Sequence, residues 1–164
     1  MNTSLLKKQI LAALLGGILF SANAALKVGD TLPDLAGFKL EGNLPESLKG
    51  KVVIVDFWAS WCLPCAKSFP VLDELQKKYG DKVVVLAVNV DEKAANMEKF
   101  LKKIPVSFAV ARDGGQKLVS VVEPQTMPTS FIVDANGQVR FLHNGFRGEE
   151  TRKEYLSEIE SLLN

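Results

Sequence analysis

Runs of β-branched and apolar residues along the chain predict strands. The first two runs, 52–55 and 83–88, are apolar at every position, which is typical of strands buried on both faces of a parallel sheet. A third run, 131–133, is followed by an Asp-Ala-Asn-Gly turn sequence and by a further segment at 138–143, and together they predict an antiparallel hairpin. Residues 118–122 fit either a strand or a short helix.

Apolar residues recur every three or four positions in three other segments, which predicts amphipathic helices. The three stripes are Phe69, Leu72, Leu75 and Tyr79, then Met97, Phe100, Leu101 and Ile104, and finally Tyr155, Leu156, Ile159, Leu162 and Leu163. Gly80 is placed to end the first helix, and Glu149 and Glu150 lie at the positive N-terminal end of the last one. Strands that alternate with helices and close in a hairpin and a helix predict an α/β domain of three layers.

The first 24 residues have the pattern of a targeting segment. Lys7 and Lys8 precede an apolar stretch at 10–20, and small residues follow it, which is the order found in secretory signal peptides. The alternative is an uncleaved membrane anchor, but a membrane span usually needs ~20 apolar residues, more than this stretch has. We therefore expect a cleaved signal peptide at 1–24 and a single exported domain at 25–164.

Composition excludes several classes of function. The formal net charge of +1, with 24% charged and 47% hydrophobic residues, is ordinary for a soluble globular domain. There is no basic excess that would attract nucleic acid. Two cysteines cannot make a disulfide-rich scaffold, and with one histidine they leave little material for a metal site.

The two cysteines, Cys62 and Cys65, are separated by two residues and lie between the first predicted strand and the first predicted helix. At the start of a helix, the first sulfur faces unpaired N–H groups that stabilise a thiolate. We therefore expect Cys62 to be the attacking nucleophile and Cys65 to resolve the mixed disulfide.

Two other interpretations of the cysteine pair stay open. A structural disulfide between Cys62 and Cys65 would close a loop of four residues, which stabilises a fold by roughly 2 kcal/mol, less than a long loop would. A metal site would have three soft ligands at most, and the third, His143, is far away in the sequence. With no cysteine or acid nearby, His143 is expected to be a surface or packed residue. The position of the pair favours redox chemistry.

The segment 56–65, Asp-Phe-Trp-Ala-Ser-Trp-Cys-Leu-Pro-Cys, resembles the active-site segment of the thioredoxin superfamily. Three further positions match this family: Pro70, which bends its active-site helix, the cis-proline loop at 127–129, and a glycine of its substrate groove at Gly145. The segments 28–51 and 146–149 resemble the exported TlpA/ResA branch of the family. The resemblance implies a thioredoxin-like α/β/α domain with a central mixed sheet and a C-terminal hairpin plus helix.

The resemblance also implies how a substrate would bind. Pro128, if cis, would turn the backbone so that Met127 presents its N–H and C=O to an extended substrate segment. Trp61, Pro64 and the groove around Gly145 would supply the remaining contacts. The alternative for residues 127–129 is a tight turn before a strand.

Asp56 ends an apolar run, where a charge is costly unless it is paired. Burial would raise its pKa and make it a proton acceptor for Cys65. The alternative is a partly exposed aspartate at the end of a strand. Thioredoxins often pair this aspartate with a lysine on the neighbouring strand, but Ala87 aligns there. Ser68 stands where members that serve cytochrome c maturation often carry a glutamate.

These features favour an exported, periplasmic thiol–disulfide oxidoreductase that reduces disulfides in exported proteins. It needs no bound cofactor, because the cysteine pair carries the two electrons. The resemblance implies a membrane electron donor of the DsbD/CcdA kind, and we expect a monomer. The alternatives are a disulfide oxidase or isomerase of secreted proteins and a non-catalytic binding module. Peroxide reduction is disfavoured because Trp58 and Ala59 stand where peroxiredoxins have a proline and a threonine.

Overall fold

A six-stranded mixed sheet forms the centre of the computed structural model, which describes residues 25–164. The predicted signal peptide at 1–24 lies outside the described residues. The strands are β1 (Glu41–Gly42), β2 (Val52–Trp58), β3 (Val83–Asn89), β4 (Ala109–Arg112), β5 (Thr129–Val133) and β6 (Val139–Asn144). They lie in the order β1-β4-β3-β2-β5-β6, in which β2, β3 and β4 are parallel and the other neighbouring pairs are antiparallel.

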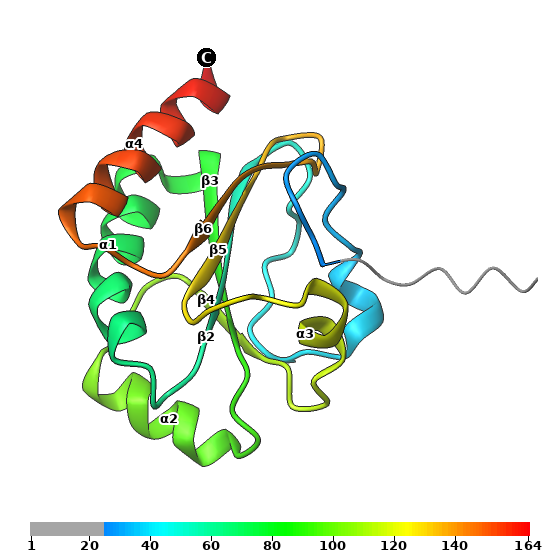
Figure 1. Cartoon of the computed structure of the whole chain (residues 1–164), viewed down its shortest axis with the longest axis vertical. Coiled ribbons are helices and arrows are strands. Elements are labelled where there is room, and N and C mark those ends of the chain that lie inside the picture. The colour runs from blue at the N-terminus through cyan, green and yellow to red at the C-terminus, as the bar shows by residue number, and fades with distance from the viewer. Residues whose placement is uncertain (1–24) are drawn as a thin grey trace, which may run out of the picture.

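Helices cover both faces of the sheet, so the domain has three layers (Figure 1). The helices are α1 (Leu63–Tyr79), α2 (Ala94–Lys103), α3 (Lys117–Val122) and α4 (Glu149–Leu163), with short 3-10 turns η1 (Leu35–Phe38) and η2 (Gly80–Lys82). α1, α2 and α4 contribute to the core on one face, and α3 and η1 to the core on the other. Among residues 25–164, the helices are all too short or too polar to cross a membrane.

Strand β2 is buried along its whole length because its side chains alternate between the two cores. Ile54 and Trp58 pack with α1 and α4, whereas Val55 and Phe57 pack on the side of α3. Asp56 lies two residues from both Ile54 and Trp58, so its side chain points into the core beneath α1 and α4. The pleat of the strand thus places a carboxyl group inside an apolar layer.

The predicted strands and amphipathic helices are all confirmed, and most of them are longer than their apolar cores. The predicted hairpin is the antiparallel pair β5–β6. Its turn is fixed by Asp134, whose Oδ1 accepts hydrogen bonds from the N–H groups of Asn136 and Gln138 at 2.9 and 3.0 Å. The expected three-layer α/β fold, with a mixed sheet and a closing hairpin and helix, is therefore the fold of residues 25–164.

The segment that fits either a strand or a helix is helix α3. The carboxylate of Asp113 lies just before it and accepts hydrogen bonds from the N–H groups of Lys117 and Val119 at 3.1 and 2.8 Å. These bonds satisfy two donors that the first turn of a helix leaves free. Strands β1 and β4 have no counterpart among the predicted strands. β4 contains two alanines and an arginine, so its sequence lacks the continuous β-branched run of its neighbours.

Candidate active site

Cys62 and Cys65 form a disulfide where β2 passes into α1, with an Sγ–Sγ distance of 2.02 Å. Cys62 is the N-cap of α1, and its Sγ accepts a hydrogen bond from the Cys65 N–H at 3.1 Å. Pro64 lies in the first turn of α1, where its missing N–H leaves no donor unsatisfied. Ser68 is buried one turn after Cys65 and donates its hydroxyl hydrogen to the Cys65 carbonyl oxygen at 3.0 Å. The helix start therefore points one backbone N–H, that of Cys65, at the sulfur of Cys62.

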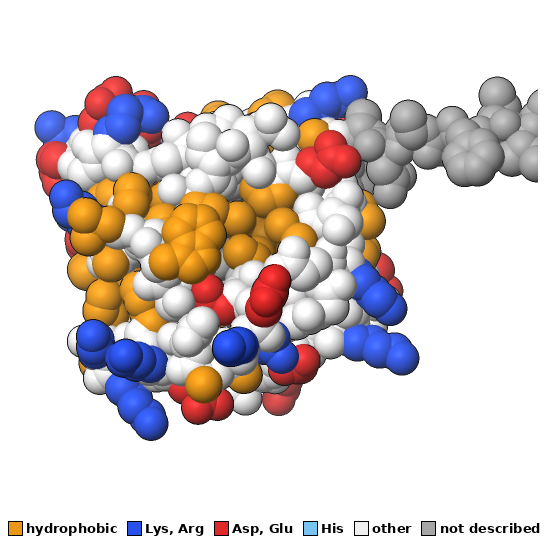
Figure 2. Space-filling model, turned by 60° about the horizontal axis from the view of Figure 1, so that its bottom comes forward, with side chains coloured by type: hydrophobic (Ala, Val, Ile, Leu, Met, Phe, Trp, Pro, Cys, Tyr) orange, Lys and Arg blue, Asp and Glu red, His pale blue; other side chains and the backbone are white. Residues whose placement is uncertain are grey.

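The two cysteines differ slightly in their exposure to solvent. Cys65 is fully buried, whereas Cys62 keeps 4% of its surface exposed. Around them the chain exposes large apolar side chains, since Trp61 is 73% and Leu63 68% exposed, and Pro64 is exposed as well. Figure 2 shows hydrophobic side chains gathered on this end of the molecule, with acidic side chains beside them and the basic groups toward its edges. The disulfide thus lies in an apolar surface rather than in a polar one.

The loop that leads into β5 contains a cis peptide bond between Met127 and Pro128. The Pro128 carbonyl oxygen accepts a hydrogen bond from the Gly145 N–H at 2.7 Å, so the glycine of the predicted groove is tied to the proline. The N–H and C=O of Met127 make no hydrogen bond within residues 25–164. Because β5 lies antiparallel to β2, this loop is at the same end of the sheet as the disulfide.

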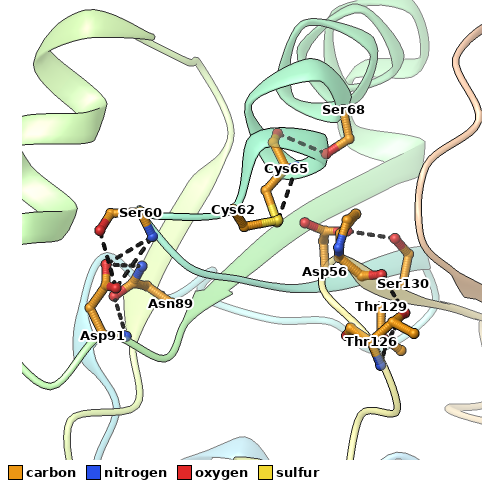
Figure 3. The surroundings of a disulfide bond; sticks show 11 residues. Asp56, Ser60, Cys62, Cys65, Ser68, Asn89, Asp91, Thr126, Thr129 and Ser130 are labelled. Atoms are coloured by element: carbon orange, nitrogen blue, oxygen red, sulfur yellow. Dashed lines mark hydrogen bonds between the residues drawn. A yellow bond between two sulfur atoms is a disulfide. The ribbon is translucent and has the colours of Figure 1, made fainter.

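Asp56 is fully buried, and Figure 3 shows its carboxyl group between the disulfide and Ser130. The Ser130 hydroxyl donates a hydrogen bond to Oδ1 at 2.5 Å, whereas Oδ2 has no partner within residues 25–164. Burial raises the pKa of Asp56 from its ordinary 3.8 to about 7, and the hydrogen bond from Ser130 opposes this rise. The alternative of a partly exposed strand-end aspartate is wrong.

Asp56 has a different neighbour on each side in the sheet. Ala87 of β3 is its register partner on one side, as the alignment predicts, so no lysine reaches it from there. Ser130 of β5 is its partner on the other side, and the Ser130 hydroxyl also bonds to the Tyr155 hydroxyl of α4 at 2.7 Å. Sequence reasoning missed Ser130 and Tyr155. Only the position of Ser130 directly after the residues of the cis-proline loop was a signal for it.

A second missed group supports the loop before Cys62. The carboxylate of Asp91 accepts hydrogen bonds from the Ser60 N–H, at 3.1 Å, and from the Ser60 hydroxyl, at 3.2 Å. The Asn89 side-chain amide donates to the same carboxylate at 3.0 Å (Figure 3). Asp91 is 4% exposed, so these bonds form in a water-poor site and fix the turn that carries Trp61.

His143 is packed rather than exposed, in line with one of the two expected environments. Its Nε2 lies 2.7 Å from a carboxylate oxygen of Glu158, and its Nδ1 lies 3.4 Å from one of Glu154. The expectation that no acid lies near it is therefore wrong, because α4 brings two glutamates that are distant in the sequence. No group of three or more His, Cys, Asp or Glu side chains among residues 25–164, this one included, is arranged to hold a metal ion.

The sequence and the fold match known proteins over most of the chain. The family model for thioredoxin-like proteins matches residues 50–139. A thiol-disulfide oxidoreductase ResA of Bacillus cereus is 34% identical over 143 residues, covering 85% of this chain and 83% of its own. ResA of Geobacillus thermodenitrificans is also 34% identical over 143 residues, with coverage of 85% and 82%.

Solved structures agree with these relatives. A protein assigned as the thiol:disulfide interchange protein DsbE, from Chlorobium tepidum, superposes with a TM-score of 0.77 at 38% identity, covering 85% of this chain and all (100%) of its own. These relatives carry the name of an enzyme that exchanges thiols and disulfides, and the chain places a cysteine pair at disulfide distance. The chain therefore belongs to the thioredoxin-like family and is a thiol-disulfide oxidoreductase of the ResA-like group.

Proposed function

We propose that the chain is an exported, periplasmic enzyme that reduces disulfide bonds in exported proteins through Cys62 and Cys65. The observation that carries the proposal is the unequal exposure of the two cysteines: Cys62 is 4% exposed in an apolar surface, and Cys65 is fully buried behind it. Only the Cys62 sulfur is placed to meet a partner's disulfide. The N-cap position and the hydrogen bond from the Cys65 N–H stabilise a thiolate on Cys62.

The reaction begins with the reduced pair. The Cys62 thiolate attacks one sulfur of the substrate disulfide, which breaks, and the other substrate sulfur leaves as a thiolate that takes up a proton. Asp56 accepts the thiol proton of Cys65. The Cys65 thiolate then attacks the Cys62 sulfur, and the second substrate sulfur leaves as a thiolate that takes up a proton, which the protonated Asp56 returns directly or through solvent. The substrate gains two electrons and two protons, and Cys62 and Cys65 end as the disulfide.

The apolar surface and the Met127 backbone suit an extended substrate segment. The N–H and C=O of Met127, which have no partner in the described part of the chain, can bind the substrate backbone as one residue of an added strand. Trp61, Pro64 and the backbone at Gly145 line the approach, and Gly145 holds Pro128 in place. This surface recognises the main chain and the apolar side chains of a substrate segment, so it accepts segments of many sequences.

Replacing Trp61 with alanine is expected to raise the KM for a disulfide-containing protein substrate about thirtyfold, because an exposed tryptophan at a contact surface often contributes roughly 2 kcal/mol. The kcat should change little, since neither sulfur is touched. Steady-state kinetics with a protein disulfide and with a small aromatic disulfide separate the two effects. Val28→Ala, at a residue 54% exposed and outside this surface, serves as the control. An equal loss on both substrates would contradict a docking role.

The proposal also includes export of the chain and re-reduction of its cysteine pair. Cleavage of the signal peptide at 1–24 would release residues 25–164 as a monomeric domain into an oxidising compartment. A reductase there has to be re-reduced, and we propose a membrane electron donor of the DsbD/CcdA kind. The test is the N-terminal sequence of the protein recovered from the periplasmic fraction. A chain that begins near residue 25 supports export, and a full-length chain in the cytoplasm overturns it.

The direction of electron flow is set by the reduction potential of the pair. For a reductase, the midpoint potential of Cys62/Cys65 is expected near or below the ~−270 mV of thioredoxin. Equilibration of residues 25–164 in dithiothreitol or glutathione buffers, followed by the fluorescence of the nearby Trp61, measures it. A value near the ~−120 mV of strong oxidants would instead make the chain a disulfide donor to secreted proteins.

A further inference from the structure

A row of four side chains crosses the sheet beneath α1 and α4. Ala87, Asp56, Ser130 and His143 are successive register partners on β3, β2, β5 and β6. Because register partners point to the same face, the polar members of the row all enter the core that Tyr155 of α4 covers. The Tyr155 ring packs edge-on against the His143 ring, with 4.8 Å between their centroids.

The hydrogen bonds in this row have a fixed direction. The Ser130 hydroxyl has one hydrogen and donates it to Asp56 Oδ1. Its bond to the Tyr155 hydroxyl, at 2.7 Å, must therefore use the hydrogen of the tyrosine. Burial raises the pKa of Tyr155, so the tyrosine keeps that hydrogen throughout the physiological range. The order of donation is Tyr155 to Ser130 to Asp56.

This order leaves one carboxyl oxygen of Asp56 free. Oδ1 accepts the Ser130 hydrogen, while Oδ2 is buried without a partner within residues 25–164. A proton therefore binds and leaves at Oδ2, and the Ser130 bond need not rearrange. We infer that Ser130 and Tyr155 are positioning residues that hold the carboxyl group of Asp56, with Oδ1 bound and Oδ2 left to exchange a proton with Cys65.

Among residues 25–164, Ser130 is the one side chain that stabilises the charge of Asp56. The groups that face Asp56 are Ser130 from β5, Tyr155 from α4, the disulfide from α1 and the uncharged Ala87 from β3. Three titratable side chains lie behind Tyr155: His143, Glu154 and Glu158. No lysine or arginine of residues 25–164 shifts the pKa of Asp56, whereas the bond from Ser130 lowers it against the effect of burial. The hydrogen bond from Ser130 on β5 thus lowers the pKa of Asp56, as a cation on β3 would. The carboxyl group can therefore both take up and release a proton near neutral pH.

The inference rests on the proposed role of Asp56, so the experiment tests the two separately. The pH titration of the Asp56 carboxyl carbon is followed by NMR in the oxidised protein. Ser130→Ala is expected to raise the Asp56 midpoint by about one unit or more, because the charged form loses its hydrogen bond. Tyr155→Phe is expected to raise it by less, and Ser130→Thr, which keeps a hydroxyl, to restore it. Ser120→Ala and Tyr79→Phe are matched controls whose hydroxyl groups bond at exposed positions on other helices.

The second readout is the rate at which the mixed disulfide on Cys62 is resolved, measured in single turnovers across pH. Its midpoint should rise in Ser130→Ala and Tyr155→Phe by the same amount as the NMR midpoint. If Asp56→Asn changes this profile while both positioning variants keep the wild-type titration, the inference is wrong and the role of Asp56 stands. If Asp56→Asn leaves the profile unchanged, the role of Asp56 and the inference both fall. Should Ser130→Ala not fold, an unshifted Tyr155→Phe overturns the inference alone.

Discussion

Replacing Cys62 with serine is expected to lower the rate of protein disulfide reduction by at least roughly a thousandfold. The serine hydroxyl does not ionise near neutral pH and forms no disulfide, so both the attack and the electron transfer are lost. The buried Cys65 cannot replace it, because its sulfur has no exposed surface. The measurement is the turnover of a disulfide-containing protein with the purified variant and an excess of a reductant that recharges the pair.

The matched variant, Cys65→Ser, is expected to fail in a different way. Attack by Cys62 still occurs, but nothing resolves the mixed disulfide, so a covalent complex with the substrate accumulates and is visible on a non-reducing gel. A complex that accumulates with Cys62→Ser instead would reverse the assigned roles. If both variants keep their partner interactions and the wild type shows no turnover, the chain is a binding module with a structural disulfide.

Asp56→Asn is expected to stabilise the oxidised protein by about 2–3 kcal/mol at pH 8. The buried carboxylate destabilises the folded protein because its pKa is raised from 3.8 to about 7, a difference that corresponds to roughly 4 kcal/mol above neutral pH. An asparagine carries no charge, but its side-chain N–H₂ replaces the unpartnered Oδ2 and offsets part of the gain. Denaturant unfolding at a series of pH values measures the difference.

The sign of the pH dependence follows from where each state holds the proton. Between about pH 4 and pH 7 the folded protein keeps the Asp56 proton and the unfolded chain has lost it, so the free energy of unfolding falls as the pH rises. Below pH 4 both states are protonated, so the gain from removing the charge disappears and only the cost of the asparagine N–H₂ remains, which leaves the variant slightly less stable than the wild type. Asp81→Asn, at an exposed position, is the control and should change stability by less than about 0.5 kcal/mol. A variant that is destabilised equally at pH 4 and pH 8 would contradict the buried charge.

The sequence predicted the parts of the fold that have a local signal. β2 and β3 each begin with a continuous apolar run because both faces of each strand are covered, and the cysteine motif lies in the turn that follows β2. β4 escaped prediction because a strand in the interior of a sheet can be built from small residues, and its only large side chain, Arg112, is held by Glu41 and by the backbone of residues 91 and 92.

The parts of the site without a local signal are contacts between distant segments. Ser130 lies 74 positions after Asp56, and Asp91 lies 31 positions after Ser60, so no spacing rule connects them. The glutamates beside His143 come from a helix whose amphipathic pattern shows which face is buried but not which strand that face covers. Serine and tyrosine are also ordinary core residues, and their chemistry appears only once the register of β2 and β5 is known.

The backbone at Met127 offers a very short stretch for pairing with another strand. Its own N–H and C=O have no partner within residues 25–164, but the next residue, Pro128, has no N–H, and the Pro128 carbonyl already accepts a hydrogen bond from Gly145. An incoming strand can therefore pair along one residue and no further. Long open edges invite self-association and aggregation, and proline is a common device against it. This surface can hold many partners briefly, and it offers no template on which copies of the chain could grow into a continuous sheet.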